Sequence, residues 1–221
     1  MTSTHTDPQA PSALHAQPAL ETGKYGFALG WLYTTRDVLF SPKRFCAGLG
    51  SGPLALPFAF AALSLLLPLL VVDFGGYVLG ISGPSQALSV VSSFRSLLGS
   101  LFTAAALTSV YGLLWGATTR LLGARAPLRT SLRAMAYLTS IGTTFGLPIT
   151  IAGFAPESAF CVILWFTSAI AAYVVVSYAF YVLARGTYGL GWVKAGFAVW
   201  LHQVACGIIG ILLTALYSAV Q

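Results

Sequence analysis

The sequence predicts an all-α polytopic membrane protein with five transmembrane helices preceded by short amphipathic helices, and three observations support this fold class. First, 57% of the residues are hydrophobic and 7% are charged, whereas a soluble domain carries roughly 25% charged residues. Second, the few charges divide the chain into long apolar intervals. Third, the basic residues fall almost entirely on one side when these intervals cross a membrane in alternate directions.

The chain before the first apolar interval divides into two parts. Residues 1–24 are polar and rich in Pro, Ala and Thr, which indicates a disordered tail. Residues 25–52 indicate two short cytoplasmic amphipathic helices, with Ser41 as the N-cap of the second and Pro42 at its first position. We expect these helices either to lie on the membrane surface or to pack on the spans. Four residues of the first recur at helical spacing: Phe27, Trp31, Thr35 and Val38.

Residues 53–221 form the predicted membrane domain. An α-helix rises about 1.5 Å per residue, so about 20 apolar residues cross the hydrocarbon core of a bilayer. The interval 74–94 is rich in Gly and Ser, and we interpret it as a loop with a short surface helix rather than a further span. The five predicted spans are residues 53–72, 96–119, 134–156, 158–184 and 195–219.

The distribution of basic residues predicts the orientation. With five spans, ten Lys and Arg residues lie on one side and Arg95 alone lies on the other. Positive charge is retained in the cytoplasm, so the N-terminus is expected there and the C-terminus outside. The acids Asp73 and Glu157 would share the outer side with Arg95, where an exposed ion pair contributes at most about 1 kcal/mol. Arginine outnumbers lysine, and Ala and Gly are abundant, which favours a GC-rich bacterial genome, and we expect the protein in a bacterial cytoplasmic membrane.

Four arginines lie within the predicted cytoplasmic loop between the second and third spans. Pro127 suits the first turn of the third span, and cations near a helix N-terminus oppose the helix dipole by about 0.3–1 kcal/mol. Membrane topology or anionic lipid headgroups would favour them instead, and a specific anion or protein site is the alternative. Nucleic acid is not expected as a partner, because the basicity reflects few acids. The four residues are Arg120, Arg125, Arg129 and Arg133.

Two features lie inside the predicted spans. Gly142 and Gly146 have the GxxxG spacing and precede Pro148, which favours close helix packing and a kink or, alternatively, a hinge or half-helix that lines a cavity. His202 is the strongly ionisable residue of the fifth span, and we expect a neutral ring with a hydrogen-bond partner. Depth in the bilayer selects two candidate partners, Tyr111 and Ser177.

The sequence offers no constellation for catalysis, metal binding or a cofactor. The three cysteines are far apart and have no CxxC spacing, so a zinc or redox site is not expected. No acidic or basic residue lies deep in a predicted span, so paired catalytic carboxylates are missing as well. We therefore expect neither an enzyme nor a bound cofactor, and we name no catalytic, cofactor-binding or metal-ligating residue.

Four short motifs in order resemble those of the Yip family, the Ypt/Rab-interacting membrane proteins, and its bacterial branch most of all. They are SPKRF, RLLGA, AYLTSIG followed by GLP, and YGLGWVKA, within residues 36–215. The resemblance implies a non-catalytic five-span protein that organises the bilayer, other membrane proteins or copies of itself. Eukaryotic members work with small GTPases, but their Asp-Leu-Tyr-Gly-Pro motif is missing here, so GTPase binding is not expected. The alternative is a small transporter or channel component, which needs a polar path through the spans.

Overall fold

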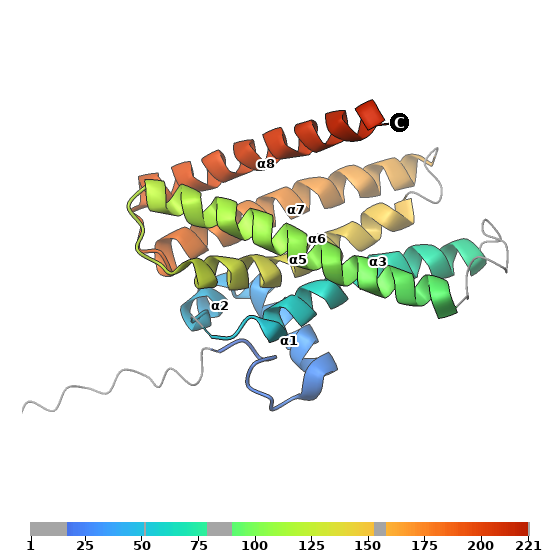
Figure 1. Ribbon diagram of the computed structural model, residues 1–221, viewed down its shortest axis with the longest axis horizontal. Helices are drawn as coiled ribbons and strands as arrows, with labels where there is room; N and C mark the ends of the chain where they lie inside the picture. The colour runs from blue at the N-terminus through green and yellow to red at the C-terminus, as the bar shows by residue number, and fades with distance from the viewer. Residues whose placement is uncertain (1–16, 51, 79–89, 153–157, 221) are drawn as a thin grey trace, which may run out of the picture.

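The fold is all-α, as the composition predicts. The computed structural model describes residues 17–50, 52–78, 90–152 and 158–220, and within these ranges it has seven α-helices and no strand (Figure 1). Proline stands at the first position of the second helix, as predicted from Pro42. The helices are α1 (Gly26–Phe40), α2 (Pro42–Gly48), α3 (Ala55–Val78), α5 (Val90–Leu121), α6 (Leu128–Ala152), α7 (Ala159–Gly186) and α8 (Trp192–Val220).

The five long helices α3, α5, α6, α7 and α8 run alternately between the two ends of an elongated bundle (Figure 1). Helix α6 packs against α3, α5 and α7 and is the centre of the bundle, whereas α8 packs against α5 and α7 at one side. The short helices α1 and α2 pack on α6 and α7. Of the two sequence-based alternatives for them, packing on the long helices is therefore the one observed.

Two helices are long and apolar enough to cross a membrane. They are α7, with a mean hydropathy of 2.3, and the Trp192–Leu212 part of α8, with a mean hydropathy of 1.7. Many of their large apolar side chains are exposed rather than packed inside the bundle, including Phe160, Ile170 and Ile211. An exposed apolar surface of this kind supports association with a membrane, while the arrangement in five spans stays a prediction.

Several helix ends differ from those predicted. Helix α3 continues past Asp73 to Val78, and α5 begins at Val90. The loop predicted from residue 74 is therefore wrong for residues 74–78, whereas a helix that leads into the second span was part of the same prediction; residues 79–89 lie outside the described part of the chain. Glycine costs about 1 kcal/mol in a helix, and packing of α3 along α5 offsets such a cost over several turns.

Ser41 joins α1 to α2 without the predicted side-chain cap. Its hydroxyl makes no capping hydrogen bond, and its backbone N–H instead donates to the Asp37 carbonyl at 3.0 Å and closes α1. Ser41 thus follows the last residue of α1 and precedes the first residue of α2. With its N–H committed to α1 and its φ and ψ at −138° and 48°, it lacks the extended backbone of a usual N-cap.

The close glycine contact of the bundle lies on α5 rather than on α6. A Cβ at Gly112 would lie 2.8 Å from Leu132 Cδ2 and 3.1 Å from its Cα, and a Cβ at Gly116 would lie 2.8 Å from Leu128 Cδ1. These two glycines have GxxxG spacing and bring the α5 backbone against α6. At Gly142 and Gly146 an added Cβ would meet nothing within 4 Å, so the close packing predicted there is wrong.

This difference between the two glycine pairs can be tested by substitution. Gly112→Ala forces its methyl group against the Leu132 backbone, and we expect a loss of about 1–3 kcal/mol in the free energy of unfolding. Gly142→Ala is the matched control, and it should be neutral or stabilise α6 by up to about 1 kcal/mol, because the site is open. Unfolding in detergent micelles measures both. Equal destabilisation by the two substitutions would contradict the packing described here.

Candidate functional site

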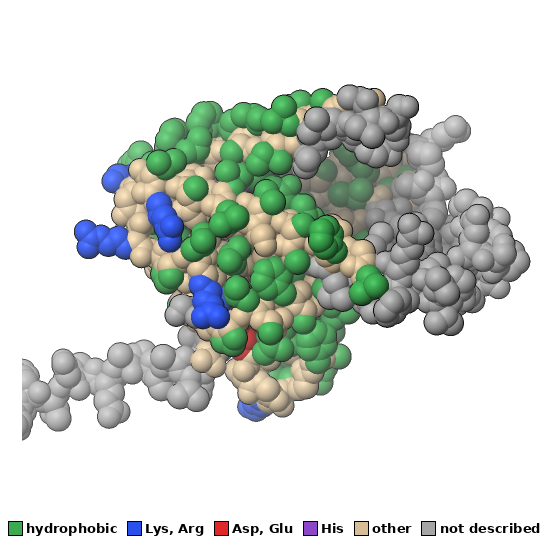
Figure 2. Space-filling view, in the orientation of Figure 1, with side chains coloured by type: hydrophobic (Ala, Val, Ile, Leu, Met, Phe, Trp, Pro, Cys, Tyr) green, Lys and Arg blue, Asp and Glu red, His purple; other side chains and the backbone are tan. Residues whose placement is uncertain are grey.

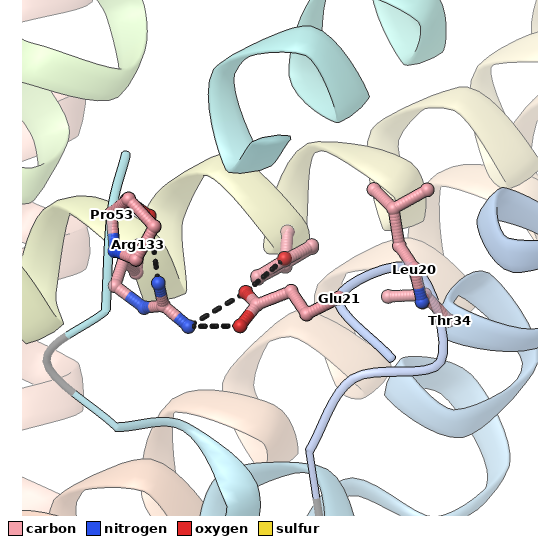
Figure 3. A network of polar contacts seen from close by, with 6 residues as sticks. Leu20, Glu21, Thr34, Pro53 and Arg133 are labelled. Atoms are coloured by element: carbon pink, nitrogen blue, oxygen red, sulfur yellow. Dashed lines mark hydrogen bonds and ion pairs between the residues drawn. The ribbon is translucent and has the colours of Figure 1, made fainter. Parts of the chain in front are cut away.

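A buried ion pair fastens the segment before α1 to the bundle. Arg133 lies on the second turn of α6, and its side chain is 2% exposed. Its Nη2 donates to both carboxylate oxygens of Glu21 at 2.6 Å, and its Nη1 donates to the Pro53 carbonyl at 2.7 Å (Figure 3). Tyr137, one helical turn later, donates its hydroxyl to Glu21 Oε1. The network thereby joins the N-terminal segment, the entry to α3 and the centre of α6.

Arg133 therefore does not hold the loop at lipid headgroups, as its sequence position suggested. Its guanidinium is enclosed by the protein, and an acid from the predicted tail neutralises it. Its grouping with the other arginines followed from its place in the predicted loop, and position in the sequence alone does not show burial. Arg120, Arg125 and Arg129 are exposed, and their role in topology or headgroup binding stays a prediction.

Residues 17–25, here called the N-terminal strap, are packed on α1 rather than disordered. Leu20 is buried, and its backbone N–H donates to the Thr34 hydroxyl at 3.0 Å (Figure 3). A Cβ at Gly30 would lie 3.0 Å from the Leu20 Cα, so glycine at this point lets the strap cross α1 at contact distance. The tail predicted for 1–24 is thus wrong for residues 17–24, and residues 1–16 lie outside the described part.

A central cavity of about 320 Å³ lies between α3, α5, α6, α7 and α8. Gly142 lines it, but α6 continues without a break past Pro148 to Ala152, so the half-helix considered at this point is wrong and a hinge stays a prediction. The hydroxyl of Thr108 is buried there, with no hydrogen-bond partner in the described structure. The polar lining residues are Thr108, Tyr111, Thr139, His202 and Cys206, and the other lining side chains are apolar.

His202 is buried among aromatic rings. The Phe180 and Trp115 ring centroids lie 4.7 Å and 5.3 Å from that of the imidazole, and Cys206 Sγ lies 3.5 Å from Nε2. Such a site favours a neutral imidazole, because a charge would lose its hydration among these rings. Trp115 itself is 0% exposed, so its ring is enclosed by the protein.

The predicted hydrogen bond from His202 to Tyr111 or Ser177 is not formed. Tyr111 does line the same cavity as His202. Ser177 instead accepts a hydrogen bond from Gln203 Nε2 at 2.6 Å and donates to the Tyr173 carbonyl at 2.6 Å. Successive helical residues point about 100° apart, so Gln203 faces Ser177 while His202 faces the cavity.

The α7–α8 connection closes the bundle at the end nearest Trp115. The Tyr188 hydroxyl lies 2.5 Å from the Ser131 hydroxyl, and its ring packs edge-on against Trp115. Burial raises the pKa of Tyr188 to about 12, against a smaller opposing effect of its hydrogen bond to Ser131. The phenol is thus neutral at physiological pH and holds the connection against α6 without adding charge.

The chemistry of the cavity is that of neutral hydrogen-bonding groups. Within the ranges that the structure describes, no group of three His, Cys, Asp or Glu side chains could hold a metal ion. No family model, no characterised protein and no solved structure matches the chain. Function is therefore inferred from the arrangement of the strap, the cavity and the basic residues.

The buried ion pair predicts an asymmetric response to mutation. Glu21→Ala leaves Arg133 buried without its acid, and we expect a loss of about 3–5 kcal/mol in the free energy of unfolding. Glu21→Leu combined with Arg133→Met removes both charges and should cost less than Glu21→Ala. Asp37→Ala is the matched control, since its partner Arg36 is 57% exposed, and its cost should stay below about 1 kcal/mol.

Unfolding in detergent micelles gives all of these free energies. If Glu21→Ala were no more destabilising than Asp37→Ala, the strap would not depend on the ion pair.

Proposed function

We propose that the protein is a non-catalytic, five-span membrane protein of the Yip type that organises other membrane proteins or copies of itself. One observation carries this proposal: the strap, α1 and α2 form a platform that a buried ion pair fixes to the bundle. The platform presents Leu29, Leu32 and Phe40 outward, and Phe40 is 80% exposed. Fixed, exposed apolar side chains are typical of protein or membrane contact surfaces.

The membrane topology that we propose places the platform in the cytoplasm. Lys194 Nζ donates to the Leu122 carbonyl at 3.3 Å, and the Thr187 hydroxyl donates to the Cys46 carbonyl at 3.0 Å. The α5–α6 connection, the α7–α8 connection and α2 therefore meet at one end of the bundle. Blue Lys and Arg side chains gather at this end in Figure 2, while green apolar side chains cover the helices beyond it. This arrangement favours a cytoplasmic N-terminus in a bacterial membrane.

A transporter or channel component is the second candidate, and the central cavity favours it. The unpartnered hydroxyl of Thr108, together with Tyr111 and His202, could bind a small polar solute. The other lining side chains are apolar, including Leu107, Leu138 and Val176, so a continuous polar path is missing from the described part of the bundle. For this reason the platform is preferred as the basis of the proposed function.

Labelling of single cysteines tests the topology. In a background with Cys46, Cys161 and Cys206 replaced by Ala, we expect a cysteine at Arg125 to react with an impermeant maleimide only after the cells are opened. A cysteine at Ser158, next to the opposite end of α7, should react in intact cells. Labelling of position 125 from outside would contradict the orientation that we propose.

Photo-crosslinking in native membranes tests the organising function. A photoreactive amino acid at Leu32, which is exposed on the platform, should give a reproducible set of crosslinked proteins or a crosslinked dimer. The matched control is the same amino acid at Ile170, which is exposed on α7 and should react mainly with lipid. If Leu32 gave no protein adducts while the purified protein carried a solute flux in liposomes, the transporter would replace the organiser.

A further inference from the structure

A second cavity, of about 470 Å³, lies between α2 and α7 on the outside of the bundle. Lys43 contributes to it from the first turn of α2, and Arg185 contributes from the last turn of α7. The hydrogen bond from Thr187 to the Cys46 carbonyl fixes the two helices beside each other. The remaining lining residues are Tyr178, Tyr181, Val182 and Gly186.

The charge in this cavity is not compensated by an ion pair with any described residue. Neither Lys43 nor Arg185 forms an ion pair in the described structure, where Glu21 pairs with Arg133 and Asp37 pairs with Arg36. Two cations that line one cavity repel each other, and an anion between them would remove that repulsion. Arg and Lys with neighbouring tyrosine hydroxyls are suited to a phosphate group, which accepts several charge-assisted hydrogen bonds.

The surroundings of the cavity favour a phospholipid over a free phosphate ion as its ligand. Ile170, Val174 and Tyr178 are exposed and recur every four residues, so they form an apolar stripe along α7 that leads into the cavity. A free phosphate ion would gain nothing from contact with this apolar stripe, whereas the acyl chain of a phospholipid would bury the stripe and be stabilised by that burial. Basic pockets on the cytoplasmic side of membrane helices bind anionic headgroups.

We propose that the cavity lined by Lys43, Arg185, Tyr178 and Tyr181 binds the phosphate of an anionic phospholipid whose acyl chain lies along α7. This site is separate from the exposed arginines of the α5–α6 connection, because its cations come from α2 and α7. The inference rests on the proposed membrane orientation, which puts both cations at the cytoplasmic interface. A lipid bound there would bridge the platform and the bundle from outside.

Lipid retention by the purified full-length protein tests the proposal. Native mass spectrometry in detergent, after addition of phosphatidylglycerol or phosphatidylcholine, should show at least one tightly retained phosphatidylglycerol. Lys43→Gln with Arg185→Gln should weaken its retention at least tenfold. The matched control, Arg125→Gln with Arg129→Gln, changes the net charge equally at two exposed arginines that do not line this cavity and should keep the lipid. Equal retention in both double variants, or equal loss in both, would overturn the site.

Two further measurements keep the result interpretable. Lys43→Arg with Arg185→Lys preserves the charges and should retain the lipid, and its failure to do so while folded would also count against a phosphate site. Glycerol 3-phosphate and inorganic phosphate at millimolar concentration should not displace the lipid, and displacement would show a soluble ligand instead. Absence of protein adducts at Leu32, with lipid retention still dependent on Lys43 and Arg185, would refute the organiser and support this site.

Discussion

The structure depends on the buried Arg133, whose charge needs an acidic partner inside the protein. Arg133 enters the bundle on α6, where its charge loses most of its hydration, and Glu21 restores that loss from a segment more than a hundred positions earlier in the chain. The same guanidinium holds the Pro53 carbonyl before α3. One side chain therefore ties both the strap and the entry to α3 to the bundle, and packing of α1 and α2 on α6 and α7 completes the platform.

Features that depend on averages over many residues could be predicted from the sequence. The order of the long helices follows from apolar intervals and the few charges between them, and α6, α7 and α8 begin within six residues of the predicted spans. The C-terminal end of α3 could not be predicted in this way. Residues 74–78 contain two glycines, which have a weak preference for helix, yet they continue α3.

Features that depend on the direction of one side chain could not be predicted. The two GxxxG pairs are equivalent by spacing, yet Gly112 and Gly116 face α6 while Gly142 and Gly146 face open space. The predicted depth in the bilayer correctly brought Tyr111 to the same cavity as His202. It could not show that Gln203, rather than His202, faces Ser177. Arg133 had one signal in the sequence: it precedes a long run without charged residues, and an arginine buried there needs an acid. That acid is Glu21, which follows the buried Leu20 in the strap.

The position of Trp115 gives the protein an internal optical reporter. Its ring is fully buried and touches both His202 and Phe180, which line the central cavity. Trp165, Trp192 and Trp200 are exposed on α7 and α8, and Trp31 donates its indole N–H to the Ser64 hydroxyl on the other side of the bundle. With those four replaced by Phe, the emission of the remaining indole would respond to the polarity of whatever enters the cavity. Fluorescence could therefore distinguish an empty packing defect from an occupied binding site without any added label.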